Sequence, residues 1–226
     1  ERVIMSACNP DDLVIDILRQ AGSRRERIDR FTQEMLVGHI LQVLSQQQQL
    51  PYFNNIAAFP GYISTVTDLL GEIKRTGTSP QEFLGAVQAK GATEKDSEVT
   101  LIYAAYQEAL LALELADLEE MYLLAAEALA EGKVSLPCRR LYVSEFYIFT
   151  PLQIKVLLQL SRSMPIDIAI VYEKKRSRLY AAVEDTVNTL IGAGFTAHYV
   201  KRQAQTPMFD HIRDCLYSSG QAALLR

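Results

Sequence analysis

The stretch Arg139-Arg-Leu-Tyr-Val-Ser-Glu-Phe-Tyr-Ile-Phe-Thr-Pro-Leu-Gln153 is the first place where the hydrophobic pattern of this chain stops being helical. Its run Leu141–Val143 is apolar, rich in residues that favour strands, and too short for an independent helix. Thr150-Pro-Leu-Gln153 then predicts a helix start, because its Thr and Gln side chains can each cap the other's backbone N–H. A second strand is expected at 166–172, so the segment predicts a βαβ unit.

Glutamates follow both expected strands, Glu145 after the first and Glu173 after the second. Ligands of parallel sheets bind beyond the carboxyl ends of the strands, so these two positions are candidate site residues. A helix is expected at 179–191, a third strand at Phe195–Val200, where the pattern alternates weakly, and a last helix at 207–218. Three strands are few for a parallel sheet buried on both faces, so we expect further strands outside this chain.

Residues 1–135 show helical periodicity, with start and stop signals that agree with it. In the second expected helix, six apolar residues lie near one face and predict a stripe: Ile28, Phe31, Met35, Val37, Leu41 and Leu44. The predicted fold class is therefore α/β and predominantly helical, with a helical subdomain at 1–135 followed by an α/β unit with a small parallel sheet at 136–226. The early helices are expected at 9–22, 24–44, 61–76, 79–90, 97–115 and 117–132.

Composition limits the function classes. The 226-residue chain has a net charge of −4, whereas dedicated nucleic-acid-binding domains are usually basic, so any such contact must be local. No apolar run approaches the ~18 residues that cross a bilayer, and the first residues do not resemble a signal peptide, so no membrane contact is expected. Cys8, Cys138 and Cys215 are far apart and odd in number, which fits a reducing cytoplasm. The chain begins without methionine, so we expect a piece of a longer protein, although processing or a removed tag would give the same start.

The sequence contains no complete catalytic set. It has no glycine-rich loop followed by Lys and Ser or Thr, no nucleophile elbow, and no paired Cys or His at metal-ligand spacing. His39, His198 and His211 are isolated and are best explained as structural residues. No catalytic residue, metal site or cofactor is therefore expected within this chain.

Three segments carry a resemblance through their order: Ile102–Leu110, Leu115–Met121 and Leu141–Gln153. They supply a Tyr-x-x-Tyr helix, an Asp-Leu-x-Glu helix start, and a strand with an acidic end followed by a final Gln. In this order they resemble the first motor domain of UvrD-like DNA helicases. A more specific resemblance is to the B subunit of the two-subunit bacterial ATP-dependent helicase/nuclease of the AddAB type. It rests on the run Phe146–Gln153, together with 59–63 and 72–82.

The departures from that family pattern concern the motor motifs. Active motors end the strand in Asp-Glu, where the Asp helps to hold Mg²⁺, but this chain has Ser144-Glu145, a vestigial Walker B-like pair. A hydroxyl is a far poorer partner for a hard dication than a carboxylate, so phosphoryl transfer would lose electrostatic stabilisation. Glu173 keeps only the acid of the next motif. Gln153 matches the motif glutamine, but a capping box explains it sufficiently, and Glu145 can equally be an ordinary strand-end carboxylate.

The resemblance implies a helicase-like scaffold that holds single-stranded DNA beside a nuclease/helicase A subunit, in double-strand break repair and recombination. It implies that 1–135 is a helicase 1B-like insertion and that 136–226 is part of a P-loop helicase-like motor domain. ATP with Mg²⁺ and a nuclease with an iron–sulfur cluster would belong to the parent protein, and the nuclease has no counterpart in these residues.

A basic turn follows the second expected strand, and we interpret it as a candidate DNA contact. Its cations could neutralise phosphates, while Tyr172 and Tyr180 flank them as stacking faces. The alternative is a solvated loop. The basic residues are Lys174, Lys175, Arg176 and Arg178.

A second basic run, at 24–30, has Glu26 and Asp29 interleaved with its arginines. We interpret it as an ordinary charged helix face with a favourable Glu26 to Arg30 pair, and the alternative is a second contact for phosphates.

Three functions remain open at this point. The first is a non-catalytic, DNA-contacting or partner-contacting segment of the B subunit. The second is an active ATP-driven helicase motor whose Walker A loop lies upstream of Glu1. The third is a helical adaptor unrelated to DNA.

Overall fold

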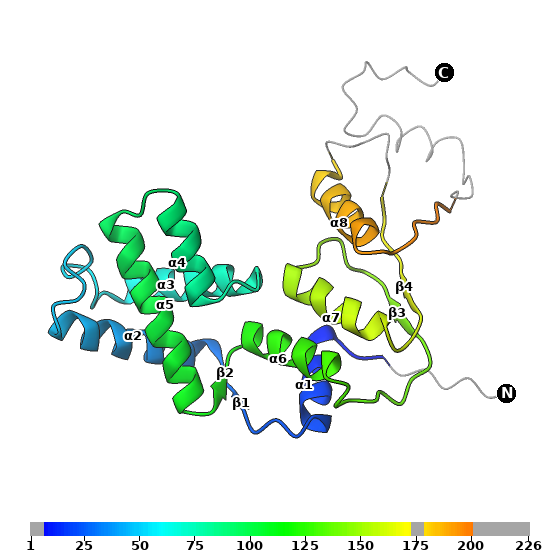
Figure 1. The fold of residues 1–226 in the computed structure, drawn as a ribbon, viewed down its shortest axis with the longest axis horizontal. Helices are drawn as coiled ribbons and strands as arrows, with labels where there is room; N and C mark the ends of the chain where they lie inside the picture. Colours follow the sequence, from blue (N-terminus) through cyan, green and yellow to red (C-terminus); the bar gives the residue numbers. More distant parts are fainter. Residues whose placement is uncertain (1–6, 173–178, 201–226) are drawn as a thin grey trace, which may run out of the picture. The chain divides into compact units, whose positions relative to one another are not determined.

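The computed structural model describes residues 7–172 and 179–200, which form eight α-helices and four short strands (Figure 1). The predicted predominance of helix is confirmed. The helices are α1 (Pro10–Gln20), α2 (Arg30–Gln46), α3 (Pro60–Arg75), α4 (Pro80–Ala89), α5 (Glu94–Ala112), α6 (Leu118–Ala130), α7 (Pro151–Ser161) and α8 (Ala181–Gly192). The strands are β1 (Glu26–Arg27), β2 (Leu115–Ala116), β3 (Leu141–Val143) and β4 (Ile166–Ile168).

The chain divides into two compact units. The first unit comprises Glu1–Tyr142 and Phe149–Asp167, and the second comprises Val143–Ile148 and Ile168–Arg226. Whether 1–135 and 136–226 are functional domains stays a prediction.

Capping side chains explain where several helices begin. The Ser79 and Glu82 side chains complete a capping box at α4, and Thr150 and Gln153 complete another at α7. The Thr150 N–H donates to Gln153 Oε1 at 2.9 Å, and the Gln153 N–H donates to Thr150 Oγ1 at 3.2 Å. These two predicted starts are confirmed, because the reciprocal bonds satisfy backbone donors that the first helical turn leaves free.

The predicted helix at 24–44 starts too early. Helix α2 begins at Arg30, because the Asp29 carboxylate accepts the Thr32 N–H at 2.8 Å and ends the extended segment before it. In that segment the Glu26 N–H donates to the Glu114 carbonyl at 2.9 Å, in a parallel two-residue pairing of β1 with β2. Glu26 is therefore not helical, and the expected pair with Arg30 does not form.

Arg30 instead forms ion pairs with a glutamate one turn later in α2 and with an aspartate of α3. Its Nε lies 2.8 Å from Glu34 Oε1, and its Nη1 lies 2.7 Å from Asp68 Oδ1. The predicted stripe on α2 was also partly wrong, since Phe31 is 71% and Met35 is 62% exposed. The buried residues of α2 are Val37, Ile40, Leu41 and Leu44, so three members of the predicted stripe are buried as expected and Ile40 joins them.

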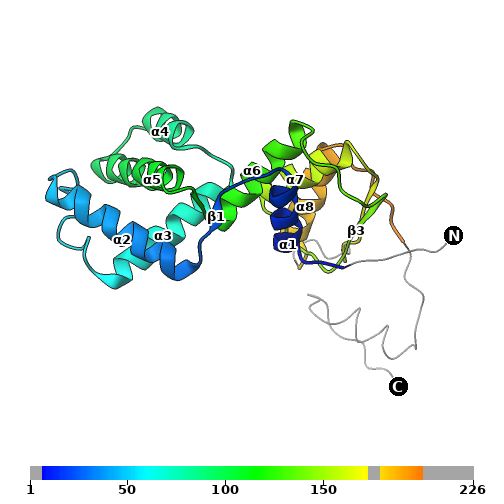
Figure 2. The same ribbon diagram turned by 90° about the horizontal axis from the view of Figure 1, so that it is seen from below.

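The first unit contains two separate apolar clusters. We call the first the α2–α5 cluster; it is built on α2, α3, α5 and the segment at 50–57, with Leu41 and Leu110 fully buried. We call the second the α1–α6–α7 cluster, where Ile17, Ala125 and Leu160 are fully buried. Figures 1 and 2 show these helix groups on opposite sides of the β1–β2 pairing.

Strands β3 and β4 are neighbours, as the βαβ prediction requires. The Leu141 N–H donates to the Pro165 carbonyl at 3.0 Å, and the Ala169 N–H donates to the Val143 carbonyl at 2.8 Å, a parallel pattern. The strand pair is not buried on both faces, since Tyr142, the middle residue of β3, is 66% exposed. Within the described residues, β3 and β4 therefore do not form the expected sheet that is buried on both faces.

Three expectations near the end of the chain have different outcomes. Strand β4 ends at Ile168, shorter than the predicted 166–172, and helix α8 confirms the helix predicted at 179–191. The predicted third strand at Phe195–Val200 is wrong: these residues are not in a strand, and Val200 is 92% exposed. Weak alternation alone is a poor strand signal, because a stable strand also needs hydrogen-bonded neighbours and an apolar face to bury. The helix predicted at 207–218 lies outside the described residues.

Within 7–172 and 179–200, the helices lack the combination of length and apolar character that a membrane crossing requires.

Candidate functional site

The structure places Ser144 and Glu145 directly after β3, and both are exposed. Glu145 has a φ of +67°, a left-handed conformation that a residue with a Cβ adopts only at an energetic cost. Such an outlier motivates a functional hypothesis without establishing one. Among the described residues, no group of three or more His, Cys, Asp and Glu side chains could hold a metal ion. The Walker B-like interpretation of this pair stays a prediction.

The Gln153 side chain is occupied by structure. Its Oε1 accepts the Thr150 N–H in the capping box, and the backbone N–H of Gln153 donates to Thr150 Oγ1 in return. These bonds supply the structural explanation that the sequence offered for this residue.

The basic turn and Glu173 were the other predicted site residues. Lys174, Lys175, Arg176 and Arg178 all lie outside the described residues, as does Glu173. The flanking Tyr172 and Tyr180 are described: their ring centroids are 6.1 Å apart and the rings meet edge to face at 87°. The structure therefore brings the two predicted stacking rings together, in contact with each other.

A group of buried polar side chains was missed by the sequence analysis. The Lys74 Nζ lies 2.7 Å from Asp117 Oδ2 and 3.2 Å from Glu120 Oε2. It also donates to Gln107 Oε1 at 3.0 Å, and the Tyr106 hydroxyl donates to Asp117 Oδ2 at 2.9 Å. We call Lys74, Tyr106, Gln107, Asp117 and Glu120 the buried charge cluster. The three charged side chains are each less than a tenth exposed.

Local sequence explains how these residues meet. Asp117 caps α6, because its Oδ1 accepts the Glu120 N–H at 2.8 Å, which leaves Oδ2 free for Lys74 and Tyr106. Lys74 follows Val66 and Leu70 at four-residue steps, so it lies on the buried face of α3. A lysine on the apolar face of a predicted helix needs a buried anionic partner, so Lys74 was the sequence signal that could have predicted the cluster.

The cluster also explains the family-like segments at 102–110 and 115–121. Tyr106 comes from the Tyr-x-x-Tyr helix, and Asp117 and Glu120 come from the Asp-Leu-x-Glu start, so the two motifs meet through side-chain bonds. The other tyrosine, Tyr103, donates to the Thr78 carbonyl at 2.6 Å. These motif residues therefore support folding directly.

Two carboxylates share one ammonium in this cluster, so each needs further donors. Burial, followed by the charge of Asp117, raises the pKa of the Tyr106 hydroxyl, which keeps it protonated and able to donate. Gln107 Nε2 donates to Glu120 Oε2 at 2.5 Å. Satisfied donors and acceptors are required here, because an unpaired buried charge is costly.

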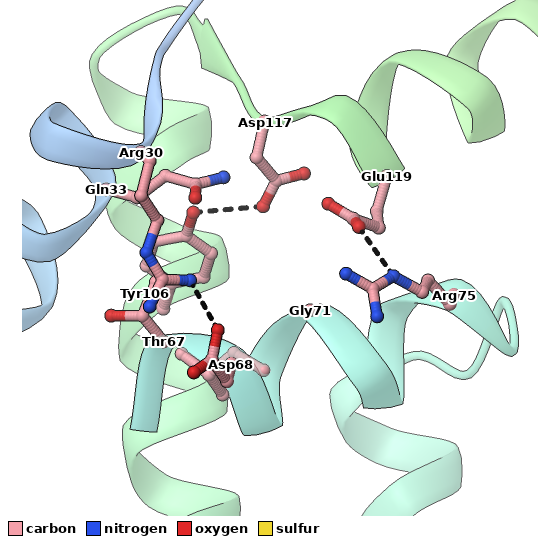
Figure 3. Close-up of a pocket in the computed structure, with 10 residues that line it drawn as sticks. Arg30, Gln33, Thr67, Asp68, Gly71, Arg75, Tyr106, Asp117 and Glu119 are labelled. Atoms are coloured by element: carbon pink, nitrogen blue, oxygen red, sulfur yellow. Dashed lines mark hydrogen bonds and ion pairs between the residues drawn. The ribbon is translucent and has the colours of Figure 1, made fainter. Parts of the chain in front are cut away.

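A small polar cavity of about 40 Å³ lies beside the cluster, between α2, α3 and α6 (Figure 3). Its two guanidiniums are already paired: Arg30 with Asp68, and Arg75 with Glu119 at 3.1 Å. A volume near that of one water molecule, with its cations paired, does not fit a nucleotide. The arrangement is therefore suited to holding helices together.

The geometry defines a predominantly helical chain with a short parallel strand pair and no assembled catalytic group among the described residues. The family model described as "ADDB, N-terminal" matches residues 13–203. This match covers most of the chain, which therefore belongs to that family, as the resemblance predicted.

Several relatives are named as the B subunit of an ATP-dependent helicase/deoxyribonuclease. The protein of Clostridium tetani (strain Massachusetts / E88) is 31% identical over 145 residues. Those of Thermoanaerobacter sp. (strain X514) and Thermoanaerobacter pseudethanolicus (strain ATCC 33223 / 39E) are each 28% identical over 142 residues. Each alignment covers 62% of this chain and 12% of the relative, so the chain spans a small part of their length.

Removing the Tyr106 hydroxyl tests the buried charge cluster. Tyr106→Phe is expected to lower the free energy of unfolding by roughly 1–3 kcal/mol, because Asp117 loses a buried donor. The matched control is Tyr52→Phe, since Tyr52 is 56% exposed and its change should have little effect. Urea unfolding followed by circular dichroism measures both, and equal effects of the two changes would contradict the assigned bond.

Proposed function

We propose that this chain is a non-catalytic, helicase-like segment of an ATP-dependent helicase/nuclease B subunit that acts in double-strand break repair and recombination. In this role it contacts single-stranded DNA, the partner subunit, or both. Family membership supports the proposal, together with the name that the relatives share. The parent's ATP, Mg²⁺ and iron–sulfur cluster, its A-type partner in a heterodimer, and its cytoplasmic location belong to the same proposal.

The observation that carries the non-catalytic part is the residue pair after β3. Ser144 stands where active motors place the aspartate that helps to hold Mg²⁺. A serine hydroxyl carries no charge to offset the dication, so it would hold the metal loosely. The parallel pairing of β3 with β4 supports the comparison, because Ser144 and Glu145 then follow a strand that has a parallel neighbour.

The contact with DNA is proposed for the basic turn. Lys174, Lys175, Arg176 and Arg178 provide four cations in five residues of a chain whose net charge is −4. Local positive charge of this kind attracts phosphates even when the whole chain is acidic. Tyr180, which lies beside the turn in sequence, is the proposed stacking residue.

ATP turnover separates this proposal from an active motor. The intact parent subunit, purified without its partner, is expected to show no increase in ATP hydrolysis when single-stranded DNA is added, because its metal-holding acid is missing. A coupled phosphate-release assay measures the rate. DNA-stimulated hydrolysis that is lost in Glu145→Gln and kept in the control Glu131→Gln would establish the motor instead.

DNA binding separates the proposal from a helical adaptor. The intact subunit is expected to bind single-stranded DNA more weakly as salt rises, and Lys174→Ala/Arg176→Ala should reduce the slope of log K against log salt by about 1.4. Fluorescence anisotropy with a labelled oligonucleotide measures this, with Lys90→Ala/Lys95→Ala as the control pair of exposed lysines. If the Lys174→Ala/Arg176→Ala variant binds DNA unchanged, the basic turn does not contact DNA. If the native subunit does not bind DNA even at low salt, the helical adaptor is favoured.

A further inference from the structure

The two apolar clusters of the first unit are joined by a largely polar junction. On one side are α3 and α5, whose Leu70, Ile102 and Leu110 belong to the α2–α5 cluster. On the other is α6, whose Met121 and Ala125 belong to the α1–α6–α7 cluster. An apolar contact also crosses, where the Leu152 side chain lies against Gly77. Each cluster therefore has its own apolar core, and the boundary between them consists mainly of hydrogen bonds and ion pairs.

The chain crosses this boundary at β1 and β2, which lie side by side (Figures 1 and 2). Within β2, Leu115 packs against the α2–α5 cluster, whereas Ala116 is buried in the α1–α6–α7 cluster. Glu114, just before them, has a φ of +54°, and Gly22, before β1, has a φ of +73°. A left-handed residue thus precedes each crossing, Glu114 directly before β2 and Gly22 four residues before β1, and the pairing is only two residues long, a geometry suited to bending.

The buried charge cluster closes the same boundary. Lys74 comes from α3, while its partners Asp117 and Glu120 come from the start of α6. Arg75 of α3 pairs with Glu119 of α6 in parallel with them. The bonds that hold the two helix groups together are therefore charged, and charges regain hydration when they separate, which offsets part of the attraction that is lost. Apolar surfaces have no such compensation, so a polar boundary opens more readily than a core.

A groove open to solvent lies along the junction. A hollow of about 260 Å³ lies beside the charge cluster, and residues from both sides line it, including Arg25, Pro80, Gln107 and Glu120. The hollow is an open groove and not an internal void, since Leu111 in its lining is 62% exposed. The hollow gives the α4–α5 side room to move relative to the start of α6.

We propose that β1 and β2 form a hinge between the two helix groups of the first unit, and that Lys74 locks it closed by binding Asp117 and Glu120. Opening breaks the lock and bends the two crossings, while each apolar cluster stays intact. The device is independent of whether the parent subunit hydrolyses ATP or binds DNA.

Single-molecule energy transfer in the intact parent subunit tests the lock. Dyes are attached through non-natural amino acids at Gln42 on α2 and Glu127 on α6, both exposed and on opposite sides of the hinge. The native lock should give one dominant transfer efficiency. Lys74→Met, which keeps side-chain length and removes the charge, should add a second population of at least about a tenth of the molecules. Lys90→Met, at an exposed position, should leave one population.

An unchanged single population in folded Lys74→Met, or the same change in Lys90→Met, would overturn the proposal. If Lys74→Met does not fold, hydrogen exchange of the native subunit decides. The Glu26 and Ile28 amides, which donate across β1–β2, should then exchange at least about tenfold faster than the buried amides of α5 through a local opening. Exchange as slow as that of α5 would show one rigid body and exclude the hinge.

Discussion

The Lys74 ammonium, held between the carboxylates of Asp117 and Glu120, is the interaction on which the first unit depends. It lies where two apolar cores meet, and it ties α3 and α5 to the start of α6. Because these charges are buried, losing one partner leaves the others unsatisfied, and such changes typically cost about 3–5 kcal/mol. The other oxygen of the Asp117 carboxylate, Oδ1, caps the start of α6, so local helix geometry and packing between helices rely on one side chain.

Local signals predicted much of this fold. Capping boxes placed the starts of α4 and α7 correctly, since reciprocal bonds over four residues need no distant partner. The start of α2 was missed because the Glu26 N–H is taken by a carbonyl at residue 114, a pairing invisible to local periodicity. Phe31 and Met35 were wrongly placed on the buried stripe of α2. A helical wheel shows which residues share a face, but it does not show which face packs against another helix.

The candidate site was predictable to a smaller extent. Ser144 and Glu145 do follow a strand with a parallel neighbour, as the βαβ pattern required. The buried charge cluster escaped because its members are spread from residue 74 to residue 120 and come together only through the packing of three helices. The family-like motifs nevertheless pointed at two of its three helices, so a motif noted for its resemblance turned out to have a structural explanation.

A double-mutant cycle between Lys74 and Asp117 tests this account most directly. Lys74→Met, Asp117→Asn and the pair of changes would be compared by urea unfolding, with Asn chosen because it still caps a helix. The account predicts a coupling energy of at least about 1.5 kcal/mol between the two sites. Losses that add to within about 0.5 kcal/mol would contradict it, because the two side chains would then be acting independently.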